Sequence, residues 1–395
     1  MLLQRSSLVS FPNLCILLFT WKSCLCNCEP FRTCSAKSTI YSSQTERERI
    51  YRLSKKPECR ENLKSDSIPY CKSAEIFHGC WREKRKHSSS QIENHMTGDL
   101  SFLQQKSLEL IWLPYRCKYE RFNKERIHDL RQRCYDDNNI TISILGDSTV
   151  RSIYCGIFRA ISVGENSYLP ENLAKIAGCG LRKAKRGVHS FSIDGISVEY
   201  HSTAVLGDMS KVKPIFPITK SKFTEGNQPL LDTLQQVVKR KPEMILLHSA
   251  GWEFREVGIA NMRKILLKKT QLDEIYERNI DLMTAGLKFV IKILQTENYE
   301  GIFLWRNAMC NIRYDADIFQ KRNFDDTVRK SGYDVFDSFE LSRGRIDALH
   351  DGYHFDRPFE GSKRKLPRNY FRHEELNALF TNILLNRLFE ACLTQ

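Results

Sequence analysis

The sequence predicts an α/β fold in which helices cover both faces of a parallel sheet. Short apolar runs rich in β-branched and aromatic residues alternate with longer segments that have helical spacing. The chain has 395 residues, of which 41% are hydrophobic and 11% aromatic, so it can bury a large core. Strands that alternate with helices are typical of a parallel sheet between two helical layers. We therefore expect a three-layer α/β domain over residues 140–395.

The elements of this domain follow one another after residue 139. The first strand is an apolar run that ends at Gly146, and a helical pattern begins directly after it. Strands are expected at residues 140–145, 244–247, 302–304 and 333–336. Helices are expected at residues 149–161, 230–238, 262–296 and 374–393.

The first 28 residues are typical of a signal peptide or a short type II membrane anchor. Arg5 precedes an apolar stretch at residues 8–21, and Lys22 closes it. This stretch has the length of a signal-peptide core and is shorter than the ~20 residues that span a bilayer. Residues 29–66 are rich in Ser, Thr and charged side chains and are expected to form a flexible stem. The sequence thus predicts a protein that is anchored in the Golgi membrane with its domain in the lumen, or secreted.

The use of cysteine also favours the secretory pathway. The chain has 14 cysteines, and residues 67–139 are expected to be a cysteine-rich N-terminal part of the same folded unit, with no C-x-x-C pair. A disulfide framework explains this pattern better than zinc, and we expect no metal site. We expect most of Cys71, Cys80, Cys117 and Cys134 to be paired, without a predicted connectivity. Asn139 begins the single glycosylation sequon, which opens the first strand.

The positive charge does not indicate a nucleic-acid partner. The formal net charge is +14, from 61 basic and 47 acidic residues. The basic residues are scattered, and no zinc-finger, RNP or basic-zipper motif accompanies them. A solvated basic surface is the interpretation that this pattern favours.

A candidate nucleophile lies at the end of the first strand. Gly146-Asp147-Ser148 directly precedes a helix, so Ser148 is expected at the carboxyl edge of the sheet, where α/β folds bind ligands. Free N–H groups and the helix dipole at that place favour a developing oxyanion. A serine nucleophile also needs an imidazole and a carboxylate that orients it. Without these partners, Ser148 would be interpreted as a helix cap.

A candidate base and its carboxylate follow the last strand. Residues 347–354 contain two overlapping Asp-x-x-His units, Asp347 with His350 and Asp351 with His354. Either unit can place a carboxylate and an imidazole together in a loop at the same edge of the sheet as Ser148. The two motifs together predict a Ser–His–Asp site for acyl transfer, with both units open as the base.

These motifs resemble a known family. The segment from Gly146 to Arg151 is similar to the G-D-S-x-x-R signature of the PC-esterase branch of the SGNH (GDSL-like) hydrolase superfamily. That branch includes trichome-birefringence-like O-acetyltransferases and neurexophilin-and-PC-esterase proteins. The resemblance extends from about Cys71 to the C-terminus. It includes Gly79-Cys80-Trp81, the Trp112 to Cys117 segment with Arg121-Phe122 after it, and Ser249-Ala250-Gly251-Trp252.

The resemblance implies roles for individual residues. Ser148 would be the nucleophile, and its own N–H would form part of the oxyanion hole. Asp351 and His354 match the D-G-x-H motif of the family and are preferred over Asp347 and His350. The residues implied near the oxyanion or the substrate are Gly146, Asp147, Arg151, Gly251 and Trp252. Arg306, after the third strand, is interpreted either as a substrate ligand or as an ion-pair residue at the sheet edge.

Three functions follow as hypotheses. The first is a luminal O-acetyltransferase that acts on glycan hydroxyls, with a donor such as acetyl-CoA as a co-substrate and no resident cofactor. The second is an esterase that uses the same triad and water. The third is a non-catalytic glycan-binding or interaction protein on this scaffold. Many members of the superfamily carry a G-x-N block, whereas here Gly251 is followed by Trp252 and Glu253. That difference keeps the third hypothesis open.

Overall fold

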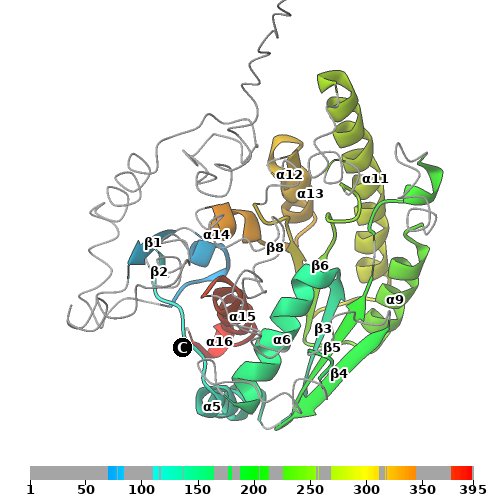
Figure 1. Cartoon of the computed structure of the whole chain (residues 1–395). Coiled ribbons are helices and arrows are strands. Elements are labelled where there is room, and N and C mark those ends of the chain that lie inside the picture. Colours follow the sequence, from blue (N-terminus) through cyan, green and yellow to red (C-terminus); the bar gives the residue numbers. More distant parts are fainter. Residues whose placement is uncertain are drawn as a thin grey trace, which may run out of the picture.

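The chain folds around a mixed six-stranded sheet with helices around it (Figure 1). The computed structural model describes residues 70–77, 79–83, 110–114, 117–136, 138–163, 177–179, 187–203, 205–212, 226–254, 257, 268–310, 316, 318–343 and 375–393. The fold is therefore α/β, as the alternation of strands and helices predicted. The expected leader at residues 1–28 and the expected stem at residues 29–66 lie outside the described residues.

The strand order of the sheet is β4-β5-β3-β6-β7-β8. All neighbouring strands run parallel except β4, which is antiparallel to β5. Residues of β6 are buried along its whole length because both faces of the sheet are covered. The strands are β3 (Ile140–Gly146), β4 (Val188–Ile193), β5 (Ile196–Ser202), β6 (Met244–His248), β7 (Ile302–Arg306) and β8 (Asp334–Phe336). The four expected strands correspond to β3, β6, β7 and β8.

The expected parallel sheet is parallel over most of its strands, but it is mixed because β4 and β5 form an antiparallel hairpin. Ile193 pairs with Ile196 across a two-residue turn, in which Asp194 has φ 49° and Gly195 has φ 77°. Asp-Gly suits this turn because both central residues need positive φ. Along β5, Val198 and Tyr200 are buried while the residues between them are partly exposed. The turn and this alternation are both visible in the sequence and could have predicted the hairpin.

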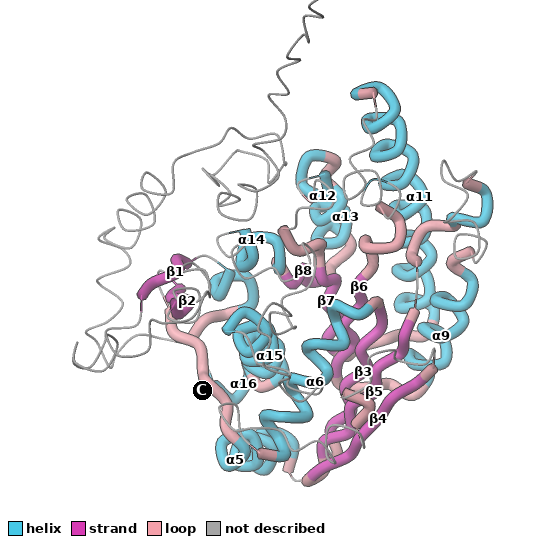
Figure 2. The backbone as a smooth tube through the Cα atoms, in the orientation of Figure 1, coloured by secondary structure: helices cyan, strands magenta, loops and turns pink. Residues whose placement is uncertain are grey.

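The helices form layers on the two sides of the sheet (Figure 2). Helix α6 (Ser148–Ser162) packs against β3, β4 and β5 and against α15 (Glu375–Leu388), whereas α9 (Gln228–Lys239) packs against β3 and α11 (Lys269–Thr296). The remaining helices are η1 (Ser73–Phe77), α5 (Lys124–Tyr135), η3 (Met209–Lys211), α12 (Ile318–Lys321), α13 (Phe324–Lys330), α14 (Ser338–Arg343) and α16 (Glu390–Leu393).

Two helix boundaries differ from the expected ones. α11 begins at Lys269, and residues 262–267 of the expected helix lie outside the described part of the chain. The Gln271 side chain accepts a hydrogen bond from the Lys268 N–H at 3.0 Å. This contact satisfies one of the amide donors that a helix leaves unpaired at its start. The expected C-terminal helix is divided into α15 and α16 around Phe389. The fully buried ring of Phe389 packs against Phe122, with ring centroids 5.8 Å apart.

The N-terminal part of the described chain shares the core of the sheet domain. Strands β1 (Gly79–Glu83) and β2 (Leu110–Pro114) form an antiparallel pair, and Trp112 donates from Nε1 to the Ile76 carbonyl at 2.9 Å. The Phe122 N–H donates to the Asn382 side chain on α15 at 2.9 Å. The buried side chains of this region belong to the same hydrophobic cluster as the strands. The Trp112 and Phe122 motif positions thus have a packing role.

Disulfides join parts of the chain that are distant in sequence. Among the described residues, the pairs are Cys71–Cys117, Cys134–Cys392 and Cys155–Cys179, with Cα–Cα distances of 4.8, 5.8 and 5.6 Å. Three of the four expected cysteines are therefore paired, and the side chain of Cys80 lies outside the described part. The Cys134 pair links α5 to α16, a connection that no spacing in the sequence predicts. These disulfides are consistent with an oxidising compartment such as the secretory pathway.

Candidate functional site

The candidate site lies where the order of the sheet changes direction. The chain passes from β3 to β5 on one side and then crosses to β6 on the other, so the carboxyl ends of β3 and β6 lie side by side. Doubly wound sheets bind ligands at this kind of switch point. Ser148 follows β3 as the first residue of α6 and is partly exposed. The structure thus places the candidate nucleophile at the edge that the sequence predicted.

Asp147, not Ser148, caps helix α6. The Asp147 carboxylate accepts hydrogen bonds from the Thr149 N–H at 2.8 Å and the Thr149 hydroxyl at 2.7 Å. An aspartate here also interacts favourably with the positive end of the helix dipole. The interpretation of Ser148 as a mere helix cap therefore loses its basis.

Gly146 allows β3 and β6 to approach closely at this turn. Its φ is +152°, a conformation that L side chains rarely adopt. A Cβ atom at this position would lie 2.6 Å from the His248 carbonyl oxygen and 2.9 Å from a methyl group of Val150. Glycine is therefore needed here for a structural reason, because only a residue without a side chain lets the strand, the turn and the helix lie this close together.

The hydroxyl of Tyr200, on β5, contacts the backbone of the same turn. Its hydroxyl donates to the carbonyl oxygens of Gly146 and Asp147, at 3.3 and 3.1 Å. Burial raises the pKa of Tyr200 to about 12, so the hydroxyl remains a donor at neutral pH. Arg151 is half-buried in the first turn of α6, where its charge acts on the Tyr200 hydroxyl.

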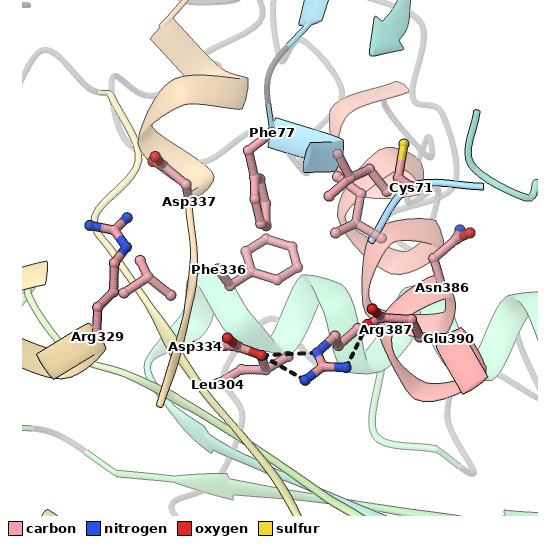
Figure 3. Close-up of a pocket in the computed structure, with 13 residues that line it drawn as sticks. Cys71, Phe77, Leu304, Arg329, Asp334, Phe336, Asp337, Asn386, Arg387 and Glu390 are labelled. Atoms are coloured by element: carbon pink, nitrogen blue, oxygen red, sulfur yellow. Dashed lines mark hydrogen bonds and ion pairs between the residues drawn. The ribbon is translucent and has the colours of Figure 1, made fainter. Parts of the chain in front are cut away.

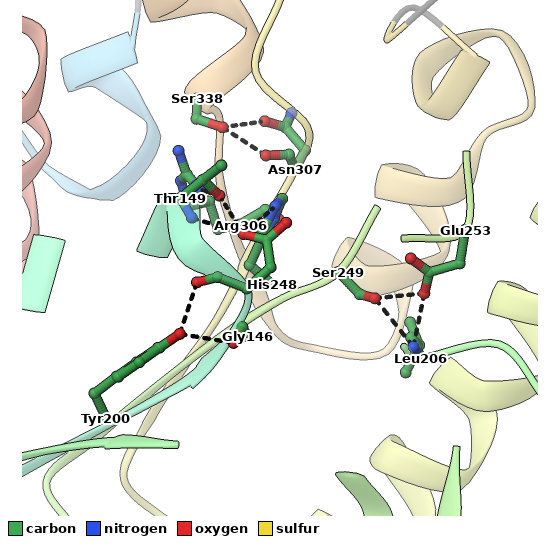
Figure 4. A network of polar contacts seen from close by, with 11 residues as sticks. Gly146, Thr149, Tyr200, Leu206, His248, Ser249, Glu253, Arg306, Asn307 and Ser338 are labelled. Atoms are coloured by element: carbon green, nitrogen blue, oxygen red, sulfur yellow. Dashed lines mark hydrogen bonds and ion pairs between the residues drawn. The ribbon is translucent and has the colours of Figure 1, made fainter. Parts of the chain in front are cut away.

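A buried polar network lies behind the turn (Figure 4). Arg306 is fully buried at the end of β7 and donates from Nη1 to the Thr149 hydroxyl oxygen at 2.8 Å. Its backbone carbonyl accepts from His248 Nδ1 at 2.9 Å. Arg306 therefore does not present its guanidinium to solvent as an exposed substrate ligand would.

His248 is a neutral member of this network. Burial lowers the pKa of His248 to about 4, so the imidazole carries no charge near neutral pH. The proton lies on Nδ1, which donates to Arg306, while Nε2 is 3.8 Å from Asp147 Oδ1. That distance is too long for a hydrogen bond, and the pair is not an ion pair at neutral pH. His248 was not predicted as a site residue, although a histidine that ends a buried strand is a signal visible in the sequence.

The block after β6 packs against the segment after β5. Ser249 donates to Glu253 Oε1, and the Leu206 N–H donates to the same oxygen at 2.7 Å. Trp252 packs against the buried pair Val205 and Met209. Glu253 has no exposure to solvent, and burial raises its pKa to about 7. Glu253, which occupies the asparagine position of the G-x-N block, is thus a buried acid, and Trp252 before it lies in a packed turn.

A second buried cluster lies at the end of β7. Asn307 donates from Nδ2 to Asp325 and Asp337, at 2.9 and 2.8 Å, and its Oδ1 accepts from the Phe339 N–H at 2.9 Å. Burial raises the pKa of Asp325 to about 6. These contacts hold the start of α14, which is the last described element before the expected base. This cluster was not predicted from the sequence either.

The expected base and its carboxylate lie outside the described residues. α14 ends at Arg343, and the next described residue is Glu375. Both units, Asp347 with His350 and Asp351 with His354, fall between them. The choice between the two histidines therefore remains a prediction.

A hollow beside β8 lies at a different place from Ser148. A cavity of about 320 Å³ is lined by Phe77 and Phe336 and by charged side chains at its rim (Figure 3). Arg387 donates there to Asp334 at 2.7 Å and also contacts Glu390. Ser148 does not line this cavity.

The described residues contain neither a metal-binding cluster nor a membrane-spanning helix. No group of three or more His, Cys, Asp or Glu side chains in the described ranges is arranged to hold a metal ion. Within the same part of the chain, no helix is both long and apolar enough to span a bilayer.

Comparison with models of known protein families returned no match, and neither did comparison with curated protein sequences.

Proposed function

We infer that this protein is a serine-dependent O-acyltransferase of the SGNH type, which moves acetyl groups onto glycan hydroxyls through an acyl-enzyme on Ser148. The observation that carries this inference is the position of Ser148. It begins a helix at the switch point of a doubly wound sheet, and the helix is already capped by Asp147. The order of the strands and the helices on both sides support an SGNH-like arrangement.

The proposed chemistry uses two half-reactions. The Ser148 hydroxyl attacks the acyl carbonyl, and its proton passes to the imidazole of His354, which Asp351 orients. The leaving group takes that proton, and the acyl group remains on Ser148. A glycan hydroxyl then loses its proton to His354 and attacks the acyl-enzyme, which frees the serine. The Ser148 N–H, at the positive end of the α6 dipole, is the proposed donor that stabilises the oxyanion in both steps.

Labelling with a fluorophosphonate probe tests the nucleophile. Wild-type protein is expected to be labelled, whereas Ser148→Ala is not, because the probe forms its bond with an activated serine. The fold should survive, since Asp147 and not Ser148 makes the capping contact. Ser162→Ala at the end of α6, where the hydroxyl contacts the Phe158 carbonyl, is the matched control and should label like wild type. Labelling of Ser148→Ala at the wild-type rate contradicts the proposal.

The same experiment separates the remaining hypotheses. Absence of labelling in folded wild-type protein would favour a non-catalytic glycan-binding or interaction protein. A parallel sample of wild-type protein that has not been treated with the probe should be incubated with an acetyl donor and mixed glycans. Acetylated glycans in the mass spectrum support the transferase, and donor hydrolysis without acetylated glycans supports the esterase. The esterase is the second candidate because its first half-reaction is identical.

Passage through the secretory pathway is tested at Asn139. This residue is exposed and lies immediately before β3, at the amino end of the strand whose carboxyl end leads to Ser148. We expect protein secreted by cultured cells to lose mass on treatment with an N-glycosidase, and Asn139→Gln to abolish that loss. Asn138→Gln alters the exposed neighbour outside the sequon and should keep the glycan. Wild-type protein with no glycan would contradict the prediction.

A further inference from the structure

Arg306 is a charged side chain that is held completely away from solvent. Its guanidinium lies over the ring of Phe380, 5.1 Å from the ring centroid, and donates to Thr149 on helix α6. Removing a guanidinium from water carries a large desolvation penalty, which an apolar side chain of similar size would avoid. A buried charge at the active edge of the sheet therefore calls for a role beyond the packing of the core.

Thr149 connects this charge to the residue that precedes Ser148. Because the Thr149 hydroxyl oxygen accepts a hydrogen bond from Arg306, the hydroxyl proton is directed to Asp147, 2.7 Å away. The same Asp147 oxygen accepts the Thr149 N–H at 2.8 Å. Asp147 and Thr149 are the two chain neighbours of Ser148. Their contacts thus determine the orientation of the backbone on both sides of the serine.

We propose that Arg306 is a positioning residue for Ser148 and that it acts through the hydroxyl of Thr149. This proposal rests on the proposed function of Ser148 as a nucleophile. The contact holds the first turn of α6, where the Ser148 N–H is the proposed donor to the acyl oxygen when negative charge develops there. It also places a fixed positive charge behind the turn at a fully buried position, where the effective dielectric constant is lower than at the surface and charges interact more strongly.

The charged and titratable groups around Arg306 are consistent with this role. His248 is neutral and contacts the Arg306 backbone, not its guanidinium. Asp147 supplies the negative charge, at the far side of the Thr149 hydroxyl. The positive charge of Arg306 and the helix dipole therefore both face the place where Asp147 and the transient oxyanion carry negative charge.

The alternative is that Arg306 and Thr149 only brace the fold, and a set of threonine variants separates the two. Thr149→Val removes the hydroxyl with little change of shape, and Thr149→Ser retains it. Thr381→Val is the matched control, because Thr381 is a buried threonine of α15 whose hydroxyl donates to the Asn377 carbonyl at 3.0 Å. This control removes a buried threonine hydroxyl without touching the site.

The measurement is the rate of labelling of the full chain by the fluorophosphonate probe, over a range of probe concentrations. Thr149→Val is expected to lower the maximal labelling rate about tenfold or more. The probe concentration that gives half of the maximal rate should change little. Thr149→Ser should recover most of the wild-type rate, and Thr381→Val should label like wild type. A purely structural role would slow Thr149→Val and Thr381→Val alike or leave both unchanged, and either result overturns the proposal.

Failure of the proposed function is distinguishable from failure of this proposal. If Thr149→Val labels like wild type, the positioning role is wrong and Ser148 remains the nucleophile. If wild-type protein is not labelled at all, the proposed function fails, and amide hydrogen exchange decides the role of Arg306. Arg306→Gln should then speed exchange of the Thr149 amide relative to wild type and Thr381→Val. Unchanged exchange at that amide overturns the ordering of the turn by Arg306.

Discussion

His354→Ala is expected to reduce labelling of Ser148 by a fluorophosphonate probe by about 10³-fold or more, because an unassisted serine hydroxyl is a poor nucleophile. The expectation follows from the match of Asp351-Gly352-Tyr353-His354 to the D-G-x-H motif and from the position of Ser148 at the start of α6. The measurement is the labelling rate of the purified variant, with far-UV circular dichroism to verify folding.

His350→Ala is the matched control for this prediction, because His350 lies four residues before His354 in the same segment. It should retain most of the wild-type rate. Asp351→Asn is expected to slow labelling strongly, since an amide favours the wrong tautomer of the imidazole, whereas Asp347→Asn should not. If the effects of the two units are reversed, the base is His350 and the class of enzyme stands. If all four variants label like wild type, the triad is wrong.

The stability of the protein is expected to decrease between about pH 4.5 and pH 7 through Glu253. Burial raises the pKa of this carboxyl from 4.5 to about 7, so the folded state holds the proton more tightly than the unfolded state. The contribution of Glu253 to the free energy of unfolding is fully present below the pKa of this carboxyl in the unfolded state, 4.5. It is lost as the pH rises through the pKa in the folded state, about 7. The difference amounts to ~3 kcal/mol, on the scale of about 1.4 kcal/mol per pKa unit.

Glu253→Gln is the variant that measures this contribution. Glutamine keeps an oxygen for the Leu206 N–H and the Ser249 hydroxyl but carries no charge in either state. Its free energy of unfolding relative to wild type should rise from near zero at pH 4.5 to ~3 kcal/mol above pH 7. The pKa of His248 is lowered, so His248 acts in the opposite direction below pH 6.5 in both proteins and cancels in the difference.

The measurement is urea unfolding of the two proteins from pH 4.5 to 8, with Glu300→Gln at an exposed position as the matched control. A difference between Glu253→Gln and wild type that does not depend on pH would contradict the prediction. Such a result would mean that Glu253 is ionised in the folded protein.

The sequence by itself determined the elements whose signal is local. Buried parallel strands appear as continuous apolar runs, and for this reason β3, β6, β7 and β8 were predicted close to their observed bounds. Helix α6 was predicted because its apolar residues repeat at helical spacing directly after Gly146. The position of Ser148 at the carboxyl edge follows from these two local signals. The β4–β5 hairpin also had a local signal in Asp194-Gly195, so it was predictable although it was not predicted.

Only the tertiary structure decided which polar side chains meet behind Ser148. Arg306 and Thr149 are 157 residues apart in sequence. Arg306 ends β7 and Thr149 follows β3, and these two strands flank β6 on opposite sides. The disulfide between Cys134 and Cys392 likewise joins residues 258 apart. Periodicity reports which face of an element is buried, but it carries no information on the order of strands in a sheet. Contacts between the ends of different strands depend on that order, and the buried charge behind the nucleophile therefore becomes visible only in the folded chain.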